Sequence, residues 1–411
     1  MKRNFSHTGC IVLCTLTYLP MVYAEGDQGY RTESGLTIIP IFDTKLEYND
    51  NIGRYSEEIP PESSYLLDVS PGILLKSDRG GNLYSVGYQL SSGTYFDSPD
   101  DNYLDHNFYT KNFVRYNIRH GMGFDYQYKR DHQERGTGIF AGDEFSTRAL
   151  NPVEYQQHNL DLKYIYGADG ARGRIEAKAN YTDREYLNYR FLTGTDEPFS
   201  TSYKDYSQVG GGLAFYYRRN DTTSLFAELD ANDRHYEREF NGRIQDSLNL
   251  FYFIGGAWEI TGVTTGTIRL GLQDKDYKDP NSEDFQGFSW NVKLNWKPVE
   301  YSSINFSGGQ RARDPDQGVN SQYIQSTLLN ADWKHYWQYN IFSMITLASI
   351  RDVYSASDRE DDKVRASIGV GYRIRRDFEA LLRWQYEEKD SNVPNKSYTQ
   401  NAYGLAATYR F

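Results

Sequence analysis

Asp233 and His235 are the residues of this sequence whose types and spacing come closest to acid–base chemistry. Two positions apart on a strand, their side chains would point to the same face, and a carboxylate beside an imidazole can act as a general acid–base pair. This spacing is common by chance, and no second paired carboxylate lies in a matching place. No metal-ligand spacing is visible among His106, His120, His132, His158 and His335. Since no serine nucleophile motif is visible either, the sequence predicts no catalytic, cofactor-binding or metal-binding residue, and no enzyme.

The first residues of the chain have the features of a secretory signal. Lys2 and Arg3 precede a mostly apolar stretch over 11–22, and small residues follow at the positions that a signal peptidase reads. We therefore predict a signal peptide over 1–24, cleaved between Ala24 and Glu25. A short membrane anchor is the alternative, but the apolar run is shorter than the ~20 residues that a spanning helix needs. Both cysteines lie inside this segment, so the mature chain would have no disulfide and no thiol nucleophile.

The composition favours strands and disfavours a nucleic-acid partner. The chain has 45 Lys and Arg against 56 Asp and Glu, and the predicted leader contributes only cations, so the mature part is strongly acidic. Such a charge is unsuited to a phosphate backbone. The sequence also has 37 Tyr, 21 Phe, 6 Trp and 35 Gly, which are strand formers and turn formers. No linker divides the chain, so we predict one domain.

Apolar and polar residues alternate over many segments of the chain. Phe288, Trp290 and Val292 interleave with Ser289 and Asn291, which is the period expected of a strand with two dissimilar faces. The same alternation recurs at 36–49, 65–75, 84–90, 122–128 and 364–374, and again at 403–411. No amphipathic helix of comparable clarity is visible. The pattern predicts an all-β protein.

The connections between these segments alternate in length. Short turns are expected at 77–81, 118–121, 167–173, 218–221, 260–264, 297–300, 337–340 and 375–378, and longer polar loops near 50–63, 96–106, 130–155, 184–204, 233–246, 276–286, 313–322, 352–362 and 389–397. Eight turns and nine loops give about 18 strands (16 to 20), as expected of a transmembrane antiparallel β-barrel with short periplasmic turns and long extracellular loops. We predict a barrel over 35–411, after a short periplasmic segment over 25–34. A soluble β-sandwich is the alternative, but so many long strands would make an unusually large stack, whereas a barrel leaves no edges.

The predicted barrel implies a location and partners. The location is the outer membrane of a Gram-negative bacterium, in contact with its lipid and lipopolysaccharide. The ending with Tyr409 and Phe411 resembles the final strand by which outer-membrane barrels are recognised by the barrel assembly machinery. Two acidic clusters, Asp97 with Asp100–Asp101 and Asp358 with Glu360–Asp362, could bind divalent cations at the lipopolysaccharide surface. Neither has a calcium-loop spacing, and solvated loops are the favoured interpretation.

At about 18 strands, the interior should be wide enough for an aqueous channel. The charged residues on the polar parity are the predicted pore-lining set: Lys45, Glu47, Lys111, Arg115, Lys163, Arg174, Lys178, Arg269, Lys293, Arg311, Arg365 and Arg383. Both signs of charge are present on this parity, which argues against a simple ion filter. The charges could merely pair across a wet wall, or together with the tyrosines they could suit a hydroxyl-rich passenger such as a polysaccharide. The loop over 130–155 is either a solvated external loop or, as in general porins, a loop that folds into the lumen.

Residues 35–106 resemble the opening of the outer-membrane β-barrel porins that are encoded beside exopolysaccharide and capsule export systems. The matching positions are Tyr48, Asp50, Asn51, Ile52, Pro71, Tyr88 and Tyr95. The resemblance implies export of an exopolysaccharide, fed by a periplasmic polysaccharide-export partner. A general diffusion porin or oligosaccharide-uptake porin is the alternative. A surface hydrolase is a distant third, because the Asp-x-His at 233–235 resembles that of outer-membrane proteases, which are smaller barrels.

Overall fold

The computed structural model describes residues 29–149, 151–168, 170–190, 200–239, 242–260, 262–316 and 322–410. Its strands are β1 (Tyr30–Arg31), β2 (Leu36–Asn49), β3 (Ser64–Arg79), β4 (Asn82–Tyr95), β5 (Tyr103–Arg115), β6 (His120–Gln133), β7 (Val153–Tyr166), β8 (Gly173–Tyr186), β9 (Tyr206–Arg218), β10 (Thr223–Tyr236), β11 (Ser247–Ile260), β12 (Thr264–Tyr277), β13 (Phe285–Val299), β14 (Ser302–Arg313), β15 (Ile324–Tyr336), β16 (Ile341–Tyr354), β17 (Glu360–Arg375), β18 (Phe378–Ser391) and β19 (Tyr398–Arg410). The helical turns are η1 (Pro99–Asp101), η2 (Gly138–Phe140), α1 (Asp143–Ser146) and η4 (Ser202–Lys204).

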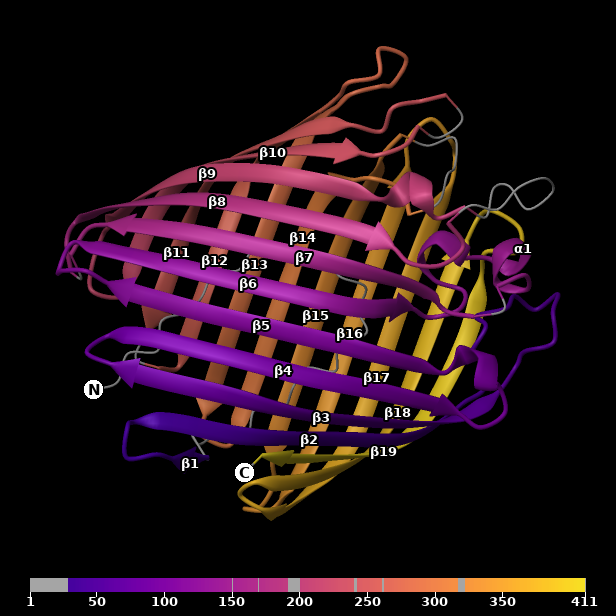
Figure 1. Ribbon diagram of the computed structural model, residues 1–411, viewed down its shortest axis with the longest axis horizontal. Helices are drawn as coiled ribbons and strands as arrows, with labels where there is room; N and C mark the ends of the chain where they lie inside the picture. The colour runs from indigo at the N-terminus through magenta and orange to yellow at the C-terminus, as the bar shows by residue number, and fades with distance from the viewer. Residues whose placement is uncertain are drawn as a thin grey trace.

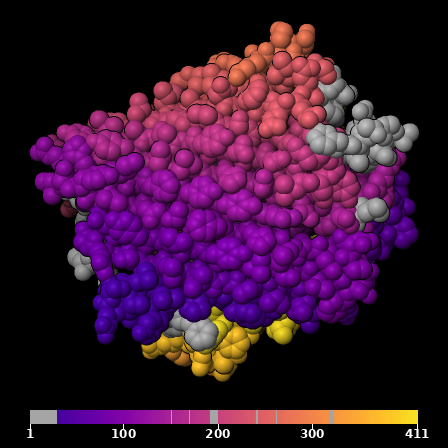
Figure 2. All heavy atoms as spheres, viewed as in Figure 1, coloured from indigo at the N-terminus to yellow at the C-terminus, as the bar shows by residue number. Residues whose placement is uncertain are grey.

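The strands β2 to β19 form one closed antiparallel barrel. Each strand is hydrogen-bonded to the next along the chain, and β19 pairs with β2 over Ala402–Arg410 and Ile41–Asn49. In Figure 1 the yellow β19 accordingly lies beside the indigo β2. Figure 2 shows one face of this wall as adjoining bands in chain order. The predicted 18-stranded all-β barrel is confirmed.

The predicted alternation of turns and loops is confirmed as well. Eight connections at one end of the barrel have two to six residues, and nine at the other end have five to nineteen. We call the longer ones loop 1 (50–63), loop 2 (96–102), loop 3 (134–152), loop 4 (187–205), loop 5 (237–246), loop 6 (278–284), loop 7 (314–323), loop 8 (355–359) and loop 9 (392–397). The helical turns lie in loops 2, 3 and 4.

The described part of the chain begins and ends at the short-turn end of the barrel. The predicted cleavage site at Ala24 and Glu25 and the terminal Phe411 fall outside the described residues. Inside the predicted 25–34 segment, the two residues of β1 pair with Thr37 and Ile38 of β2. They thereby cover the part of β2 that extends beyond the end of β19. Tyr409 belongs to the exposed parity of β19, and its ring packs edge-on against Phe378 at 5.9 Å.

The two parities of each strand have different chemistry. Large apolar side chains are exposed along the outer parity, for example Leu382 at 65% and Val209 at 63%. The opposite parity carries buried charges, such as Glu387, which has no exposed surface. A closed barrel satisfies its backbone hydrogen bonds internally, so an apolar outer face suits contact with lipid. No helix in the described part of the chain is long and apolar enough to cross a bilayer.

Inward-facing glycines let charged side chains pair across an intervening strand. Arg269 of β12 donates to Glu228 of β10 at 2.8 Å, and between these two strands β11 presents Gly255, which is paired with Arg269. A Cβ at Gly255 would lie 2.1 Å from the Ile268 carbonyl oxygen and 2.3 Å from the Phe226 ring. The glycine is therefore required by close packing.

We expect Gly255→Ala to lower the free energy of unfolding by roughly 1–3 kcal/mol, because the added methyl overpacks the wall. The measurement is urea unfolding of the barrel in lipid vesicles. Gly256→Ala is the matched control, since a Cβ there meets its nearest atom at 3.9 Å. Equal stability of the two variants would show that the contact at Gly255 has no energetic consequence.

Candidate functional site

Carboxylates with two or more basic partners recur along the inner wall. Glu47 is 3.2 Å from Lys45 on its own strand and 2.8 Å from Arg383 of β18. Gly404 of β19 lies between Glu47 and Arg383, and it is paired with both residues in the sheet. Because Gly404 has no side chain, the Glu47 carboxylate and the Arg383 guanidinium can contact each other across the inward face of β19.

The other carboxylates on this parity have similar surroundings. Glu176 is 2.7 Å from Lys163 and 2.9 Å from Arg174. Glu228 is bound by Lys178 of β8 in addition to Arg269. Each of these carboxylates is therefore shared by two cations. Such sharing fixes the long basic side chains against the wall.

Glu387 of β18 is the most heavily bonded of these carboxylates. It accepts from Lys363 Nζ at 2.8 Å, from Arg365 Nε at 2.7 Å and from the Tyr398 hydroxyl at 2.7 Å. Arg54 of loop 1 adds a fourth contact, with its Nε 3.3 Å from the carboxylate. A loop residue thus reaches an inward-facing side chain four positions below the end of its strand.

All twelve predicted pore-lining residues lie on the inward parity, and the structure brings eight of them into these carboxylate groups. The eight are Lys45, Glu47, Lys163, Arg174, Lys178, Arg269, Arg365 and Arg383. Lys111, Arg115, Lys293 and Arg311 share the parity but belong to other parts of the wall. The predicted pairing across the wall is therefore present for most of the set. That these residues line a conducting pore stays a prediction.

Loops 1 and 3 are bonded to each other across the outer end of the lumen. Arg54 binds the Glu134 carboxylate and donates to the Arg135 carbonyl oxygen at 3.1 Å. Ser56 donates to Asp143 through its backbone N–H at 2.9 Å and through its hydroxyl at 2.5 Å. These contacts join one side of loop 3, including α1, to the residues that follow β2.

Further contacts hold loop 3 to loops 2 and 9. Arg135 Nε donates to Asp101 of loop 2 at 3.1 Å, and Arg135 Nη1 donates to Glu62 of loop 1 at 2.8 Å. Lys396 of loop 9 donates to the Ala141 carbonyl oxygen at 3.0 Å. Loop 3 therefore extends from the ends of β6 and β7 to the ends of β18 and β19, above β2 to β5.

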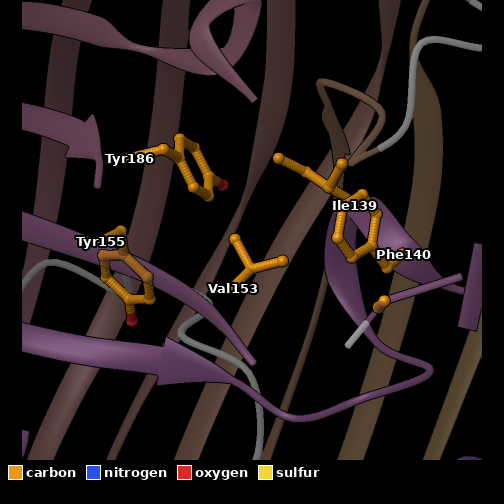
Figure 3. Packing of buried hydrophobic residues seen from close by; sticks show 6 residues of the cluster. Ile139, Phe140, Val153, Tyr155 and Tyr186 are labelled. Carbon is orange, nitrogen blue, oxygen red and sulfur yellow. The ribbon is translucent and has the colours of Figure 1, made fainter. Parts of the chain in front are cut away.

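The other side of loop 3 is held by apolar packing. Ile139 and Phe140 are each 2% exposed and pack with Val153, Tyr155 and Tyr186 of the adjoining strands. Figure 3 shows Ile139 and Phe140 facing these three side chains. The description of this segment as a solvated external loop is therefore wrong, because its apolar residues are buried. Loop 3 packs over the mouth through its contacts with loops 1, 2 and 9. That it enters the lumen and constricts it, the second possibility that the sequence left open, stays a prediction.

A second group of contacts lies at the mouth on the side of loops 4, 5 and 7. Asp314, the first residue of loop 7, lies 2.6 Å from Arg234 Nη1 of β10 and 2.8 Å from Lys275 Nζ of β12. The Tyr236 hydroxyl donates to the same carboxylate at 3.0 Å. The Tyr277 hydroxyl lies 3.3 Å from it and is also 2.7 Å from the Gln322 carbonyl oxygen of loop 7. A carboxylate thus occupies a pocket of cations and phenols on the wall.

Lys204 of η4 lies next to this group and is 6% exposed. Its Nζ donates to Gln245 Oε1 and to the Pro315 carbonyl oxygen, both at 2.8 Å. Burial lowers the pKa of Lys204 to about 8, although the charges of Asp314 and Asp316 oppose the shift. Since Lys204 lies in loop 4, its charge at the mouth changes within a range of pH that is readily tested.

Asp233 and His235 do not pair with each other in this fold. They belong to the outer parity of β10, where Asp233 is 2.9 Å from Lys278 and His235 is 2.6 Å from Asp246. The shared strand parity was predicted correctly, but each side chain has its own partner in a neighbouring loop. The geometry therefore gives no support to a joint acid–base role.

The acidic clusters that sequence reasoning described as solvated loops are partly buried. Asp101 and Asp361 are 5% and 4% exposed, and they are bound by Arg135 and Arg359 respectively. For these two residues the solvated-loop interpretation is wrong, since arginine takes the place that a cation would need. Which arginine binds each carboxylate could not be identified from the acidic clusters alone.

A different group of possible metal ligands comes together at the outer ends of β5 and β6. Asp105, Asp131 and His132 bring one donor atom each within 4.8 Å of one another. His132 Nδ1 lies 2.9 Å from Asp105 Oδ2, and its ring stacks on Tyr103 at 4.0 Å. Because Asp105 and His132 are on adjacent strands, their spacing along the chain gave no signal. The hydrogen bond between His132 and Asp105 is sufficient to explain why these three residues lie together, and a metal ion is not needed to explain it.

Comparisons with protein families and solved structures cover most of the chain. Residues 27–411 match the family described as "Putative beta-barrel porin 2", and a search of curated proteins finds no match. Among solved structures, the chain is similar to the apoprotein form of the FrpB iron transporter (F5-1 variant) from Neisseria meningitidis, at 10% identity and a TM-score of 0.49, with 91% of this chain and 81% of that chain covered. It is also similar to Pseudomonas aeruginosa OpdO, at 10% identity and 0.47, with 92% and 97% covered. For Acinetobacter baumannii OccAB3 the values are 10%, 0.45, 92% and 100%. Identities this low say nothing about a solute.

Proposed function

The chain belongs to the putative beta-barrel porin 2 family, and from this premise we propose that it is a passive channel through which small hydrophilic solutes, oligosaccharides among them, enter across the outer membrane of a Gram-negative bacterium. Family membership confirms the predicted resemblance to outer-membrane porins and extends it from residues 35–106 to 27–411. The family description names no solute. Evidence for the kind of solute therefore has to come from the residues of the lumen and of the loops.

The observation that supports small solutes is the packing of loops 1 and 3 across the mouth. Arg54 joins Glu134 of loop 3 to Glu387 of the wall, and α1 is bonded to Ser56. Loops held by buried ion pairs narrow the entrance, so a channel of this kind favours short solutes over a polymer chain. The remaining wall, with charges of both signs and many tyrosines, suits hydroxyl-rich solutes.

The test is liposome swelling with the purified, refolded barrel. We expect rapid swelling with monosaccharides and a rate that falls steadily as glucose oligomers lengthen. Liposomes without protein are the control. Absence of sugar-dependent swelling from a correctly folded barrel would refute the proposal.

Export of an exopolysaccharide is the second candidate, and the resemblance of residues 35–106 favours it. This function would require the mouth to widen, and it would require a periplasmic polysaccharide-export partner. A deletion strain separates the two candidates. Loss of secreted polysaccharide with intact intracellular synthesis supports export, whereas normal secretion with loss of growth on an oligosaccharide supports uptake. In both cases the signal over 1–24, the barrel assembly machinery and contact with lipopolysaccharide are part of the proposal.

The buried lysine of loop 4 gives a pH dependence to the channel. Because the pKa of Lys204 is lowered to about 8, this side chain is charged below pH 8 and neutral above it. We expect the preference for anions over cations to fall between pH 7 and pH 9, measured as the reversal potential in a planar bilayer with a salt gradient. Asp314, Asp316, Arg234 and Arg313 surround Lys204 and keep their charges over this range.

Lys204→Gln is the matched variant for this measurement. Lys396 of loop 9 also has its pKa lowered to about 8 by burial, so the wild type alone cannot assign the change. We expect the variant to lose a large part of the pH dependence, with Lys396 accounting for the remainder. A variant that changes with pH as the wild type does would assign the effect elsewhere.

A further inference from the structure

The carboxylate of Asp314 occupies a pocket that the barrel wall makes without it. Arg234 and Tyr236 come from β10, and Lys275 and Tyr277 come from β12, so strands position all four groups. Their side chains lie 2.6 to 3.3 Å from the carboxylate oxygens, and the Asp314 side chain is 8% exposed. Asp314 itself belongs to loop 7. The donor groups are therefore held by strands of the wall, whereas the carboxylate that they bind belongs to a loop.

The charges of this pocket are not balanced by its occupant. Two cations contact one carboxylate, and the buried Lys204 lies alongside with neutral oxygens of Gln245 and Pro315 as its hydrogen-bond acceptors. Arg234 also lies over the Tyr206 ring, 4.2 Å from its centroid. Cationic donors together with phenol hydroxyls and an aromatic face are the groups that bind a carboxylate on a sugar ring.

We propose that Arg234, Tyr236, Lys275 and Tyr277 form a carboxylate-binding subsite of the lumen, which Asp314 occupies until a carboxylated sugar displaces it. This inference rests on the proposed uptake of hydrophilic solutes and names their class as sugar acids, such as uronates. Asp314 acts as an internal competitor, so binding of the solute and release of Asp314 from the subsite are linked. A soluble carboxylate can bind only while Asp314 is out of the subsite. Its apparent affinity is therefore the intrinsic affinity multiplied by the fraction of time that the subsite is open.

Removing the competitor should therefore increase binding. For Asp314→Asn we expect the affinity for glucuronate, measured by titration calorimetry of the folded barrel in detergent, to rise at least about tenfold if Asp314 fills the subsite about nine-tenths of the time. Affinity for glucose should stay unchanged. In the double variant Asp314→Asn/Lys275→Gln, the gain should be lost.

Asp316→Asn is the matched control. It removes the same charge from the same loop, but Asp316 pairs with Arg313 at 2.9 Å and not with the subsite. A wild-type affinity for glucuronate in Asp314→Asn, or an equal gain in Asp316→Asn, would overturn the proposal. Heat-dependent mobility on gels reports whether each variant is folded.

A second measurement keeps Asp314 in place. Both native cysteines lie at positions 10 and 14, so the thiol of Asp316→Cys can be labelled selectively in a barrel that begins at residue 25. We expect glucuronate, and not glucose, to change the rate of maleimide labelling several-fold as Asp314 leaves the subsite. Equal labelling rates with the two sugars would overturn the proposal. These measurements are independent of transport, so a failure of the porin function would appear only in the swelling assay.

Discussion

Replacing Arg54 with alanine is expected to increase the single-channel conductance in planar bilayers, because this side chain joins loops 1 and 3 to the wall. Arg54 is 6% exposed and has Glu134 and Glu387 as partners. Glu387 keeps two other cations, whereas the Glu134 carboxylate would be left beside it without Arg54. Breaking a buried ion pair by removing one partner costs roughly 3–5 kcal/mol. We expect part of that cost to be relieved by movement of the loops away from the mouth.

The ion pair between Arg54 and Glu134 also predicts how the conductance of the wild type responds to acid. Burial alone would raise the pKa of Glu134, but the Arg54 charge lowers it to about 2, from an ordinary value of 4.5. A depressed pKa in the folded state stabilises the loop contact fully above about pH 4.5, and this stabilisation is lost as pH falls toward 2. Conductance of the wild type should therefore rise in that range. The Arg54→Ala variant should lack this acid response.

Arg130→Ala is the control for this prediction. Arg130 lies 2.9 Å from Glu154 on the outer face, and the two side chains are 48% and 45% exposed. Exposed pairs contribute about 0–1 kcal/mol, and this pair faces outward, away from the lumen. We expect wild-type conductance and stability from Arg130→Ala. If Arg54→Ala conducts as the wild type does, loops 1 and 3 do not limit the channel.

The wall of the barrel could be predicted from the sequence because its signal is local. Alternation at Phe288 and Trp290 is a property of neighbouring residues, and the number of connections predicted the strand count correctly. The same alternation assigned Glu47 and Arg383 to the inward parity. It could not show that they pair, since that requires the register that places Gly404 between them.

The mouth could not be predicted, because its contacts join residues that are far apart in sequence. Arg54 and Glu134 are separated by 80 positions, and neither belongs to a periodic segment. The packing of Ile139 and Phe140 could not be predicted for the same reason. Two apolar residues in a polar loop form no periodic pattern, and the strands that bury them are distant in sequence. Asp314 likewise is one acidic residue among many in the loops until β10 and β12 supply its partners.

The largest loss of stability is expected from Glu387→Gln, because this carboxylate is shared by more cations than any other residue discussed above. Its partners are Lys363, Arg365 and Arg54, and the Tyr398 hydroxyl also donates to it. Glutamine keeps the shape but removes the charge, so the cations of β17 and loop 1 would face one another without an anion between them. Removing one partner of a single buried pair costs roughly 3–5 kcal/mol, and here several pairs are broken together. The loss should therefore reach at least the upper part of that range.

The measurement is the free energy of unfolding in urea, from tryptophan fluorescence of the barrel in lipid vesicles. Glu154→Gln is the matched control, since it makes the same change in the exposed pair with Arg130 and should cost at most about 1 kcal/mol. If Glu387→Gln fails to fold, Lys363→Gln provides a milder test, because it leaves Glu387 bound by two arginines and by Tyr398. Stability of Glu387→Gln within about 1 kcal/mol of the wild type would mean that water in the lumen screens these charges. The carboxylate groups of the wall would then be determinants of solute passage and not of the fold.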